Sequence, residues 1–442
     1  MPVDRASITI QTFLDGQWHS AMVIRFDHAD HGLASPCSME YFSEYITGHL
    51  HALHSVYSPS VSASHPLSWD IQRGTAPAFL HDIIPSGAAR QHILARMAVP
   101  LGAGEDLFLL QQCTLAPIGH LRILEGVDRL SASTRVGFSR AEVIRRDIAF
   151  LDHAYEQGAA VGGATGAGGD APKLLLAEDE DGDLHPDAGL PDEQARRHWL
   201  IKFPRHPATT TDRNILFSEY CYYRALSALG FNTIDNDRLA YEEAQRPSLW
   251  MPRFDRRQEG GQLRRIAVES IYSLCGVTRP GSRMDHAAVA ERLVEVWQAA
   301  GQEHEVPGLL REYLRRDLIN QVLGNTDNHG RNLSILRESG RLCLAPMYDM
   351  APMVMDQAGV VRTTRWSDGI EQLNRVDWRR ACQLMAQWSD PDELFEGLRE
   401  DAATLRGLPD LLCSLGLPEE TWNAPMIPLK RLDELFRQWG LA

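Results

Sequence analysis

The chain has 442 residues, so two or three domains and a substantial hydrophobic interior are expected. Its formal net charge of −15 argues against a free-standing nucleic-acid binder, because neutralising phosphates requires a concentrated basic surface. Seven scattered cysteines without a CxxC pair, an N-terminus unlike a signal peptide and the lack of any apolar run of about 18 residues predict a soluble, cytoplasmic protein without a membrane partner.

The first 135 residues are predicted to form an α+β unit. A DG turn at residues 15–16 separates two β-rich runs, which is the usual sequence mark of a hairpin. A helical pattern follows at residues 41–53. Within residues 77–97 a break at Pro85 and Gly87 precedes another helix.

A Gly-rich segment at residues 161–172 follows a helical pattern at 140–158 and runs directly into an apolar strand. A second strand, HWLIKF, occupies residues 198–203. The acidic run EDEDGDLHPD, residues 178–187, lies between them. Its Asp-Gly turn predicts a solvated hairpin tip rather than a metal-binding loop.

Beyond these strands, residues 214–230 show helical spacing that ends in a glycine, and two further strands are predicted within 235–257. From residue 268 onward the pattern is mainly helical, with one short β-like piece at 333–350. No internal repeat is evident.

Lysine is rare in this chain: of 44 Lys and Arg residues, only Lys173, Lys202 and Lys430 are lysines. Two of the three lie at the end of the Gly-rich segment and in the next strand. A compact ammonium can contact phosphate oxygens while it pairs with a carboxylate, whereas a guanidinium is a bulkier planar fork. This favours phosphate binding by Lys202 over incidental survival in an Arg-rich composition, and leaves the two readings of Lys173 open.

Residues 321–336, QVLGNTDNHGRNLSIL, place Asp327 five positions before Asn332. Protein kinases use this spacing for a catalytic base and a magnesium ligand. Asp349 follows in LAPMYDM and is suited to a second metal contact, and two oxygen ligands fit Mg²⁺ because water and phosphate oxygens complete its shell. Taken alone, the spacing also fits a structural turn, in which Asp and Asn are common.

The order of the segments favours the kinase. A Gly-rich loop, a strand lysine, a helix bearing Glu219, a strand ending in MPRFD, the DxxxxN loop and a later Asp follow one another as they do in kinases. Glu219 fits a partner for Lys202 and an exposed helix-surface carboxylate equally well.

The predicted fold is α+β and protein-kinase-like, with two lobes and an additional N-terminal α/β subdomain. The expected domains are this subdomain (1–135), a nucleotide-binding lobe (136–256) and an all-helical C-terminal lobe with the catalytic loop (257–442).

The same segments resemble the HipA family of serine/threonine kinase toxins from bacterial toxin–antitoxin modules. The resemblance covers most of the chain. Its most specific part is NTDNHGRN followed by PMYD, residues 325–332 and 346–349, and GAGGDAPKLLL at 166–176 matches the nucleotide loop, with Gly168 and Gly169.

Carried over to this chain, the resemblance implies ATP and Mg²⁺ as cofactors, Asp327 as the general base toward the acceptor hydroxyl, and Asn332 and Asp349 as metal ligands. Lys202 would hold the phosphates.

Four further positions take nucleotide contacts from the resemblance. His329 and Tyr348 match family positions near the nucleotide, although His329 also fits a loop-stabilising role and Tyr348 a core position. The MPRF strand matches the segment that pairs with adenine, through Phe254. Pro252 departs from the pattern, because it has no N–H and leaves only its carbonyl.

A second departure concerns regulation. Family members often carry a Ser in or beside the Gly-rich loop whose autophosphorylation silences the enzyme. This loop has no Ser, and Thr165 is its nearest hydroxyl, so self-inactivation at Thr165 is a hypothesis.

The expected function is phosphoryl transfer from ATP to a protein Ser or Thr. By the resemblance, the acceptor is an aminoacyl-tRNA synthetase, and a helix-turn-helix antitoxin neutralises the toxin and brings it to DNA. The alternatives are a small-molecule kinase and a non-catalytic nucleotide-binding regulator. A metal-dependent nuclease is disfavoured by the Gly-rich loop and the acidic balance.

Overall fold

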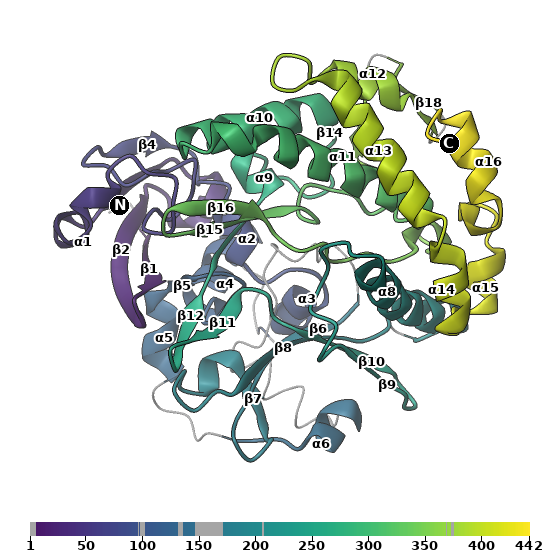
Figure 1. The fold of residues 1–442 in the computed structure, drawn as a ribbon. Helices are drawn as coiled ribbons and strands as arrows, with labels where there is room; N and C mark the ends of the chain where they lie inside the picture. Colours follow the sequence, from purple (N-terminus) through teal and green to yellow (C-terminus); the bar gives the residue numbers. More distant parts are fainter. Residues whose placement is uncertain are drawn as a thin grey trace. The chain divides into compact units, whose positions relative to one another are not determined.

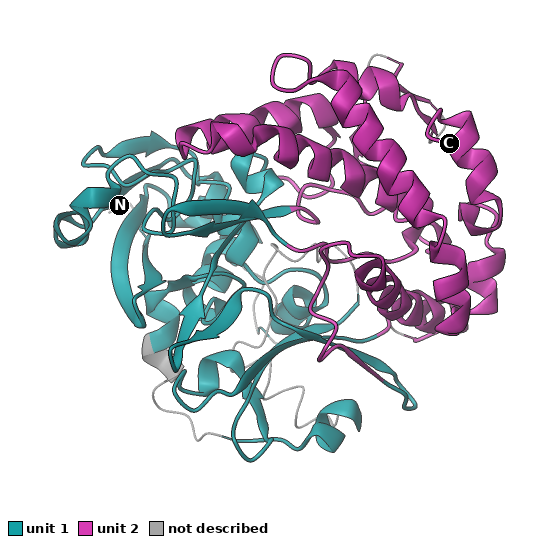
Figure 2. Cartoon of the chain, viewed as in Figure 1, with its two compact units in different colours: residues 1–203, 242–278, 334–345 teal, residues 204–241, 279–333, 346–442 magenta. Residues whose placement is uncertain are grey.

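The computed structural model of the protein describes residues 6–95, 97, 102–130, 136–145, 171–205, 207–367, 369–372 and 375–442. The chain divides into two compact units, coloured separately in Figure 2. Unit 1 contains residues 1–203, 242–278 and 334–345, and unit 2 contains 204–241, 279–333 and 346–442. The division into three domains at residues 135 and 256 stays a prediction.

All seven cysteines are free thiols. Among the described residues, no helix combines the length and apolarity needed to cross a bilayer.

Unit 1 begins with a five-stranded sheet in the order β4-β3-β2-β1-β5 (Figure 1). Its hairpin is confirmed: Asp15 and Gly16 both have positive φ, 49° and 78°, as a tight two-residue turn between twisted strands requires. The helices and strands of this part are β1 Ala6–Leu14, β2 Gln17–Phe26, β3 Cys37–Tyr41, α1 Ser43–Gly48, β4 Gln72–Gly74, α2 Leu80–Ile83, α3 Gly87–Ala95, α4 Glu105–Cys113, β5 Leu121–Ile123 and α5 Leu124–Leu130.

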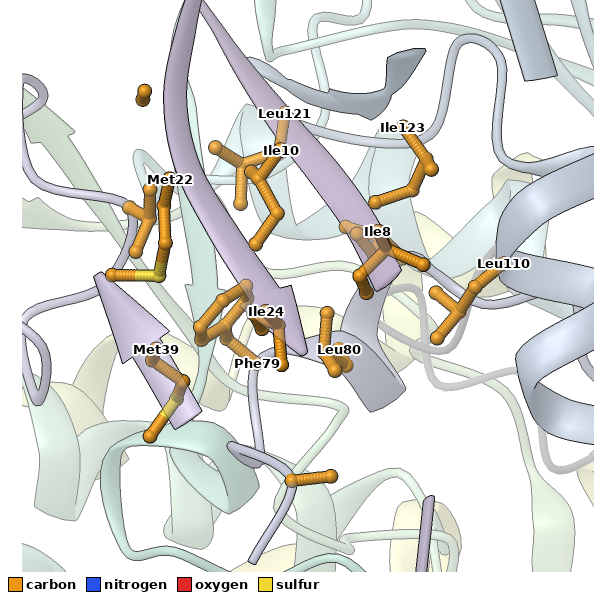
Figure 3. Close-up of a cluster of buried hydrophobic side chains, with 14 of the residues drawn as sticks. Ile8, Ile10, Met22, Ile24, Met39, Phe79, Leu80, Leu110, Leu121 and Ile123 are labelled. Carbon is orange, nitrogen blue, oxygen red and sulfur yellow. The ribbon is translucent and has the colours of Figure 1, made fainter. Parts of the chain in front are cut away.

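The core of this region lies between the sheet and α2 and α4. Figure 3 shows Ile8, Ile10 and Ile24 from the hairpin gathered with Leu80 and Leu110 from the two helices. All five side chains are fully removed from solvent. Alternate residues of the strands supply them, because successive side chains of a strand point to opposite faces.

A second five-stranded sheet has the order β7-β6-β8-β10-β9. Its members are β6 Lys173–Glu178, β7 Leu184–Pro186, β8 Arg197–Lys202, β9 Ala240–Glu242 and β10 Ser248–Pro252. The strands predicted at HWLIKF and after the Gly-rich segment are therefore confirmed. Of the helix predicted over 140–158, the described part is α6 Arg140–Arg145.

A third sheet joins segments far apart in the sequence, in the order β13-β15-β16. Arg337 on β15 is 1% exposed, pairs with Glu269 on β13 at 3.0 Å, and donates to the carbonyls of Val56 and Ser60. Burying this guanidinium is possible because Glu269 compensates its charge and its two terminal nitrogens donate to backbone carbonyls. The strands and helix here are β11 Arg256–Glu259, β12 Gln262–Arg265, β13 Ala267–Ser270, α9 Ile271–Leu274, β15 Ser334–Glu338 and β16 Arg341–Leu344.

Unit 2 is mainly helical (Figure 2). Its first long helix starts at Thr210, four residues before the predicted start, with a capping box between Thr209 and Asp212. It is followed by Gly230 at φ 84°, so the predicted C-terminal end has a local cause. Its helices and strands are α8 Thr210–Ala228, β14 Met284–Asp285, α10 His286–Ala299, α11 Val306–Val322, β17 Thr364–Arg365, β18 Glu371–Gln372, β19 Arg375–Val376, α12 Trp378–Gln383, α13 Pro391–Leu405, α14 Leu408–Ser414, α15 Glu419–Asn423 and α16 Leu432–Gln438.

Candidate active site

The loop between α11 and β15 carries the DxxxxN residues, and Asn325 organises it. The Asn325 side chain is 2% exposed and donates to the Asn320 carboxamide at 2.9 Å and to the backbone carbonyl of Asp349 at 3.2 Å. Its oxygen accepts the backbone N–H of Asp327 at 3.2 Å. One buried amide thus ties the start of the loop to the segment bearing Asp349. Sequence reasoning did not single out Asn325, although it is the first letter of the NTDNHGRN motif.

Asp327 and Asn332 are brought together by the loop itself. The side-chain amide of Asn332 donates to the backbone carbonyl of Asp327. The other end of that side chain, Oδ1, is buried and has no hydrogen-bond partner among the described residues. A buried amide oxygen without a hydrogen-bond partner destabilises the folded state unless another group binds it. Such an oxygen is a suitable ligand for a hard cation.

His329 is a neighbour of the Asp327 carboxylate. Its Nε2 lies 3.3 Å from Oδ1 of Asp327, and its Nδ1 accepts the backbone N–H of Arg331 at 3.3 Å. Because Nδ1 is an acceptor, the ring proton of the neutral imidazole is assigned to Nε2, facing the carboxylate. His329 therefore makes the loop-stabilising backbone bond considered above and also orients Asp327, whose side chain is 21% exposed.

Asp349 adopts an unusual backbone conformation. Its φ is +56°, in the left-handed region that non-glycine residues seldom occupy, and such strain persists only where the surroundings hold it. The Asn325 bond to its carbonyl is one restraint. The N–H of Met350 donates to the Tyr223 hydroxyl at 3.4 Å and is another.

Tyr223 also donates to Glu219 at 2.7 Å. Burial, together with the nearby charges of Glu219 and Asp349, raises the pKa of Tyr223 well above its usual range, so the phenol stays protonated as a donor. Glu219 is 3% exposed, which shows that the alternative of an exposed surface carboxylate was wrong. Its pairing with Lys202 stays a prediction.

Tyr348 is a buried residue that binds the far end of the DxxxxN loop. Its hydroxyl donates to the carbonyl of Arg331 at 2.6 Å, and its ring is 6% exposed. Tyr348 and Asn325 together hold residues 325–332 against the segment that carries Asp349. The expected contact of Tyr348 with the nucleotide stays a prediction.

Lys173 and Lys202 face each other in unit 1. They are direct partners in the register of β6 and β8, and are 7% and 5% exposed. Directly opposite residues project from the same face, and like charges in that position repel. The two ammonium groups thus come from adjacent positions on one face of the sheet, and their expected contact with phosphate stays a prediction.

The MPRFD strand end shows a strict alternation. Pro252 pairs with Trp199 at the end of β10, and Pro252 and Phe254 are half-buried. Arg253 and Asp255 are buried, at 5% and 1% exposed, and point into a charged cluster of unit 1. The residues expected to meet adenine thus alternate with residues that anchor the strand.

Asp187 is the centre of this cluster. Its carboxylate accepts from Arg253 at 2.5 Å, from Arg256 at 3.1 Å and from Nδ1 of His198 at 3.0 Å. Asp255 binds Arg253 and Arg256 as well, at 2.6 and 2.7 Å. These guanidinium groups outweigh the effect of burial, lowering the pKa of Asp187 well below its usual range and that of Asp255 to about 2.

The acidic run at 178–187 was thus only partly interpreted correctly. Its tip is an exposed hairpin turn with Gly182 at φ 87°, as predicted. Asp187 at its end is not solvated, being 1% exposed, because the Arg side chains that surround it come from residues more than 60 positions away.

Gly168, Gly169 and Thr165 lie outside the described residues, so their expected roles stay predictions. Within the described ranges, no group of three or more His, Cys, Asp or Glu side chains is arranged to hold a metal ion. The orphaned Asn332 oxygen and the Asp349 carboxylate are hard oxygen donors of the kind Mg²⁺ takes, and it commonly needs only one or two from the protein.

The chain combines a mixed α+β fold, a strand that carries a lysine expected to bind phosphate, and a DxxxxN loop that is hydrogen-bonded to the segment of a later Asp. This combination defines a kinase of the protein-kinase-like class. The family profile described as HipA-like C-terminal domain matches residues 165–404, more than half of the chain. The chain therefore belongs to the HipA-like family, and its fold is that of the HipA-family kinases.

The solved structures that match this chain include the following two. One is HipA of Shewanella oneidensis MR-1, in a toxin–antitoxin complex with HipB and operator DNA: 16% of residues are identical, 97% of each chain is covered and the TM-score is 0.65. The other is the Helicobacter pylori proinflammatory kinase CtkA, with 13% identity, coverage of 55% of this chain and 84% of that one, and a TM-score of 0.34. No curated protein sequence matches.

Proposed function

We propose that this protein is an ATP- and Mg²⁺-dependent protein serine/threonine kinase that acts as the toxin of a HipA-type toxin–antitoxin module. The observation that carries the proposal is the loop geometry: Asn332 donates to the Asp327 backbone, while its buried Oδ1 lacks a partner among the described residues. A purely structural turn gives no reason to leave that oxygen unpaired.

In this proposal Asp327 orients the acceptor hydroxyl and accepts its proton as the oxygen bonds to the γ-phosphorus, while the bond from that phosphorus to the β–γ bridging oxygen breaks and ADP leaves. The Nε2–H of His329 faces the same carboxylate and fixes its direction. Most of the rate enhancement comes from positioning and from charge neutralisation around the transferred group.

Asn332 and Asp349 would hold Mg²⁺, which supplies positive charge that stabilises the phosphate oxygens during transfer. The restraints on Asp349 from Asn325 and Tyr223 keep its backbone in the strained conformation before any ligand arrives. Such pre-organisation lowers the reorganisation needed in the reaction.

Nucleotide binding is assigned to residues of both the lysine strands and the loops. Lys202 and Lys173 contact phosphate oxygens, and Gly168 and Gly169 let the backbone approach them closely. The remaining contacts fall to the Pro252 carbonyl and Phe254 at adenine, and to His329 and Tyr348.

The test is incubation of the purified protein with γ-labelled ATP, Mg²⁺ and a cell extract, followed by separation of the labelled proteins. We expect a labelled protein band, and loss of transfer by at least about 10³-fold in Asp327→Ala with ATP affinity changed little. Substantial phosphorylation by Asp327→Ala would refute the role of Asp327. Label appearing only on small metabolites would instead identify a small-molecule kinase, and ATP binding without transfer a non-catalytic regulator.

The partners follow from the family. The similar Shewanella structure contains HipA, HipB and operator DNA, which supports a helix-turn-helix antitoxin as the partner and DNA contact through it. The net charge of −15 agrees with delegating DNA contact to that partner. An aminoacyl-tRNA synthetase is the proposed acceptor, to be identified by mass spectrometry of the labelled band.

Thr165 is the proposed site of self-inactivation, since it is the nearest hydroxyl to the Gly-rich loop. Mass spectrometry after incubation with ATP tests this directly. An unmodified Thr165 on an enzyme that transfers phosphate to its target would remove the idea.

A further inference from the structure

Unit 2 contains a cavity of about 360 Å³ that the proposed reaction does not use. It is lined by the end of α11, by the start of the catalytic loop, by residues that follow Asp349 and by part of the C-terminal segment between Met426 and Trp439. Its volume is within the range of sites for small organic molecules. Val354, Met426 and Leu435 supply apolar side chains to the lining.

The charged residues that line the cavity favour an anion. They are Arg362, Arg375, Arg431 and Glu434, and the three that are not already neutralised by buried acids are two arginines and one carboxylate. Arg375 and Arg431 are exposed at the surface, while Arg362 is 6% exposed and is paired with two buried acids. In a chain with a formal charge of −15, a local excess of guanidinium groups around a cavity attracts anions that the rest of the surface repels.

Four lining residues also carry a buried polar atom without a hydrogen-bond partner among the described residues. These atoms are Oε1 of Gln321, Oγ1 of Thr326, Nη1 of Arg362 and Nε1 of Trp439. The last two are donors on side chains that are more than nine-tenths buried. These atoms have almost no accessible surface, so a ligand in the cavity reaches them only after lining side chains move, and the charge contacts of the site come from the exposed guanidinium groups of Arg375 and Arg431.

We propose that this cavity binds a small organic anion, with an oxyanion held by the arginines and an apolar body against Val354, Met426 and Leu435. A guanidinium binds carboxylate or phosphate oxygens through parallel N–H bonds, so both kinds of oxyanion suit the site. Because Arg375 and Arg431 are exposed, their guanidinium groups can bind the oxyanion without breaking buried ion pairs.

The cavity adjoins the residues that hold the catalytic loop. Its lining includes Gly324 and Asn325, and the Asn325 side chain bonds both the Asp327 N–H and the Asp349 carbonyl. Gly324 has φ 67°, and a Cβ there would lie 2.8 Å from the Ile427 side chain. The C-terminal segment thus packs directly on the residue before the loop, so a ligand in the cavity stabilises the loop in its present conformation.

Binding is measured by isothermal titration of the full chain without ATP, using phenyl phosphate and benzoate as anionic probes and benzyl alcohol as the neutral counterpart. We expect the anions to bind and the alcohol to bind at least about tenfold more weakly, since it lacks the charge-assisted bonds. The double variant Arg375→Gln/Arg431→Gln should weaken the anions by about tenfold or more.

Arg437→Gln is the matched control, because Arg437 is an exposed arginine of α16, close in sequence to the lining residues, and does not line the cavity. It should bind the probes as the wild type does. The proposal is overturned if neither anion binds at about 10 mM, if benzyl alcohol binds as tightly as the anions, or if the double variant binds unchanged. Circular dichroism of each variant shows whether it is folded.

The effect on the loop rests on the proposed kinase function and is measured separately, as the rate of phosphoryl transfer with and without phenyl phosphate. A change in rate that the double variant loses supports the coupling. Binding without any change in rate refutes the coupling alone, and absent transfer under all conditions refutes the kinase function while the binding result stands.

Discussion

Replacing Asp187 by Ala is the sharpest test of how the MPRFD strand is held in unit 1. The substitution removes a carboxylate that accepts from Arg253, Arg256 and His198. Asp255 then faces both guanidinium groups alone. A buried cluster with two acids and two paired arginines becomes a cluster with an uncompensated positive charge.

The expected cost in the free energy of unfolding is about 3–5 kcal/mol, the range found when one partner is removed from a buried ion pair. The hydrogen bonds give a similar value. Three bonds to a charged acceptor are lost, and at about 1.5 kcal/mol each, the low end for such bonds, they amount to about 4.5 kcal/mol. The pKa of His198 is lowered by burial, so its ring stays neutral and does not add to the charge imbalance.

The measurement is urea unfolding followed by circular dichroism at neutral pH. Asp181→Ala is the matched control, because Asp181 belongs to the same acidic run but lies exposed at the hairpin tip. It should change the free energy of unfolding by less than about 0.5 kcal/mol. If Asp187→Ala costs less than about 1 kcal/mol, or no more than the control, the cluster does not anchor this strand.

Three further predictions concern acidity, the catalytic loop and the strand lysine. Because the folded protein lowers the pKa of Asp255 from 3.8 to about 2, its contribution of about 2 kcal/mol is present above pH ~4 and is lost as the pH falls from about 4 toward 2. The difference in unfolding free energy between wild type and Asp255→Asn should shrink over that range, and a constant difference would contradict the assignment. Gly324→Ala should destabilise the protein by about 1–3 kcal/mol more than Gly340→Ala. Both glycines have positive φ, but only Gly324 lacks space for a Cβ. Equal decreases in melting temperature for the two variants would show that the loop adapts. Lys202→Arg should lower kcat/KM for phosphoryl transfer at least about tenfold although it keeps the charge. Lys430→Arg, at an exposed position, should leave kcat/KM unchanged. A Lys202→Arg enzyme with wild-type activity would show that any cation suffices at this position.

Local sequence patterns determined most of the individual helices and strands. The Asp15-Gly16 hairpin, the strand ending at Lys202 and the helix ending before Gly230 are each specified by residues within a few positions of one another. The DxxxxN spacing likewise works over one loop, where the Asn332 amide reaches back to the Asp327 carbonyl. Such features can be predicted because their stabilising contacts are short in sequence.

The surroundings of the candidate site were decided by tertiary structure. Burial of Glu219 and its bond from Tyr223 turned a candidate surface carboxylate into an interior one. Asn325 acquired its role only because the carbonyl of Asp349, 24 residues later, lies within hydrogen-bonding distance. No rule of periodicity or spacing predicts a hydrogen-bond partner for Asn325 that lies 24 residues away in the sequence.

The same limit explains the two features that sequence reasoning did not find. Asp187 is identical in type to its exposed neighbours in the acidic run, and only the arrival of Arg253 and Arg256 makes it a buried anion. The cavity of unit 2 needs α11, the catalytic loop and the C-terminal segment to meet. The sequence thus determined which chemistry-bearing residues this member of the kinase family possesses. The packing of distant segments decided which of these residues are buried, paired or left with an unsatisfied polar atom, because burial and long-range contacts are properties of the folded chain.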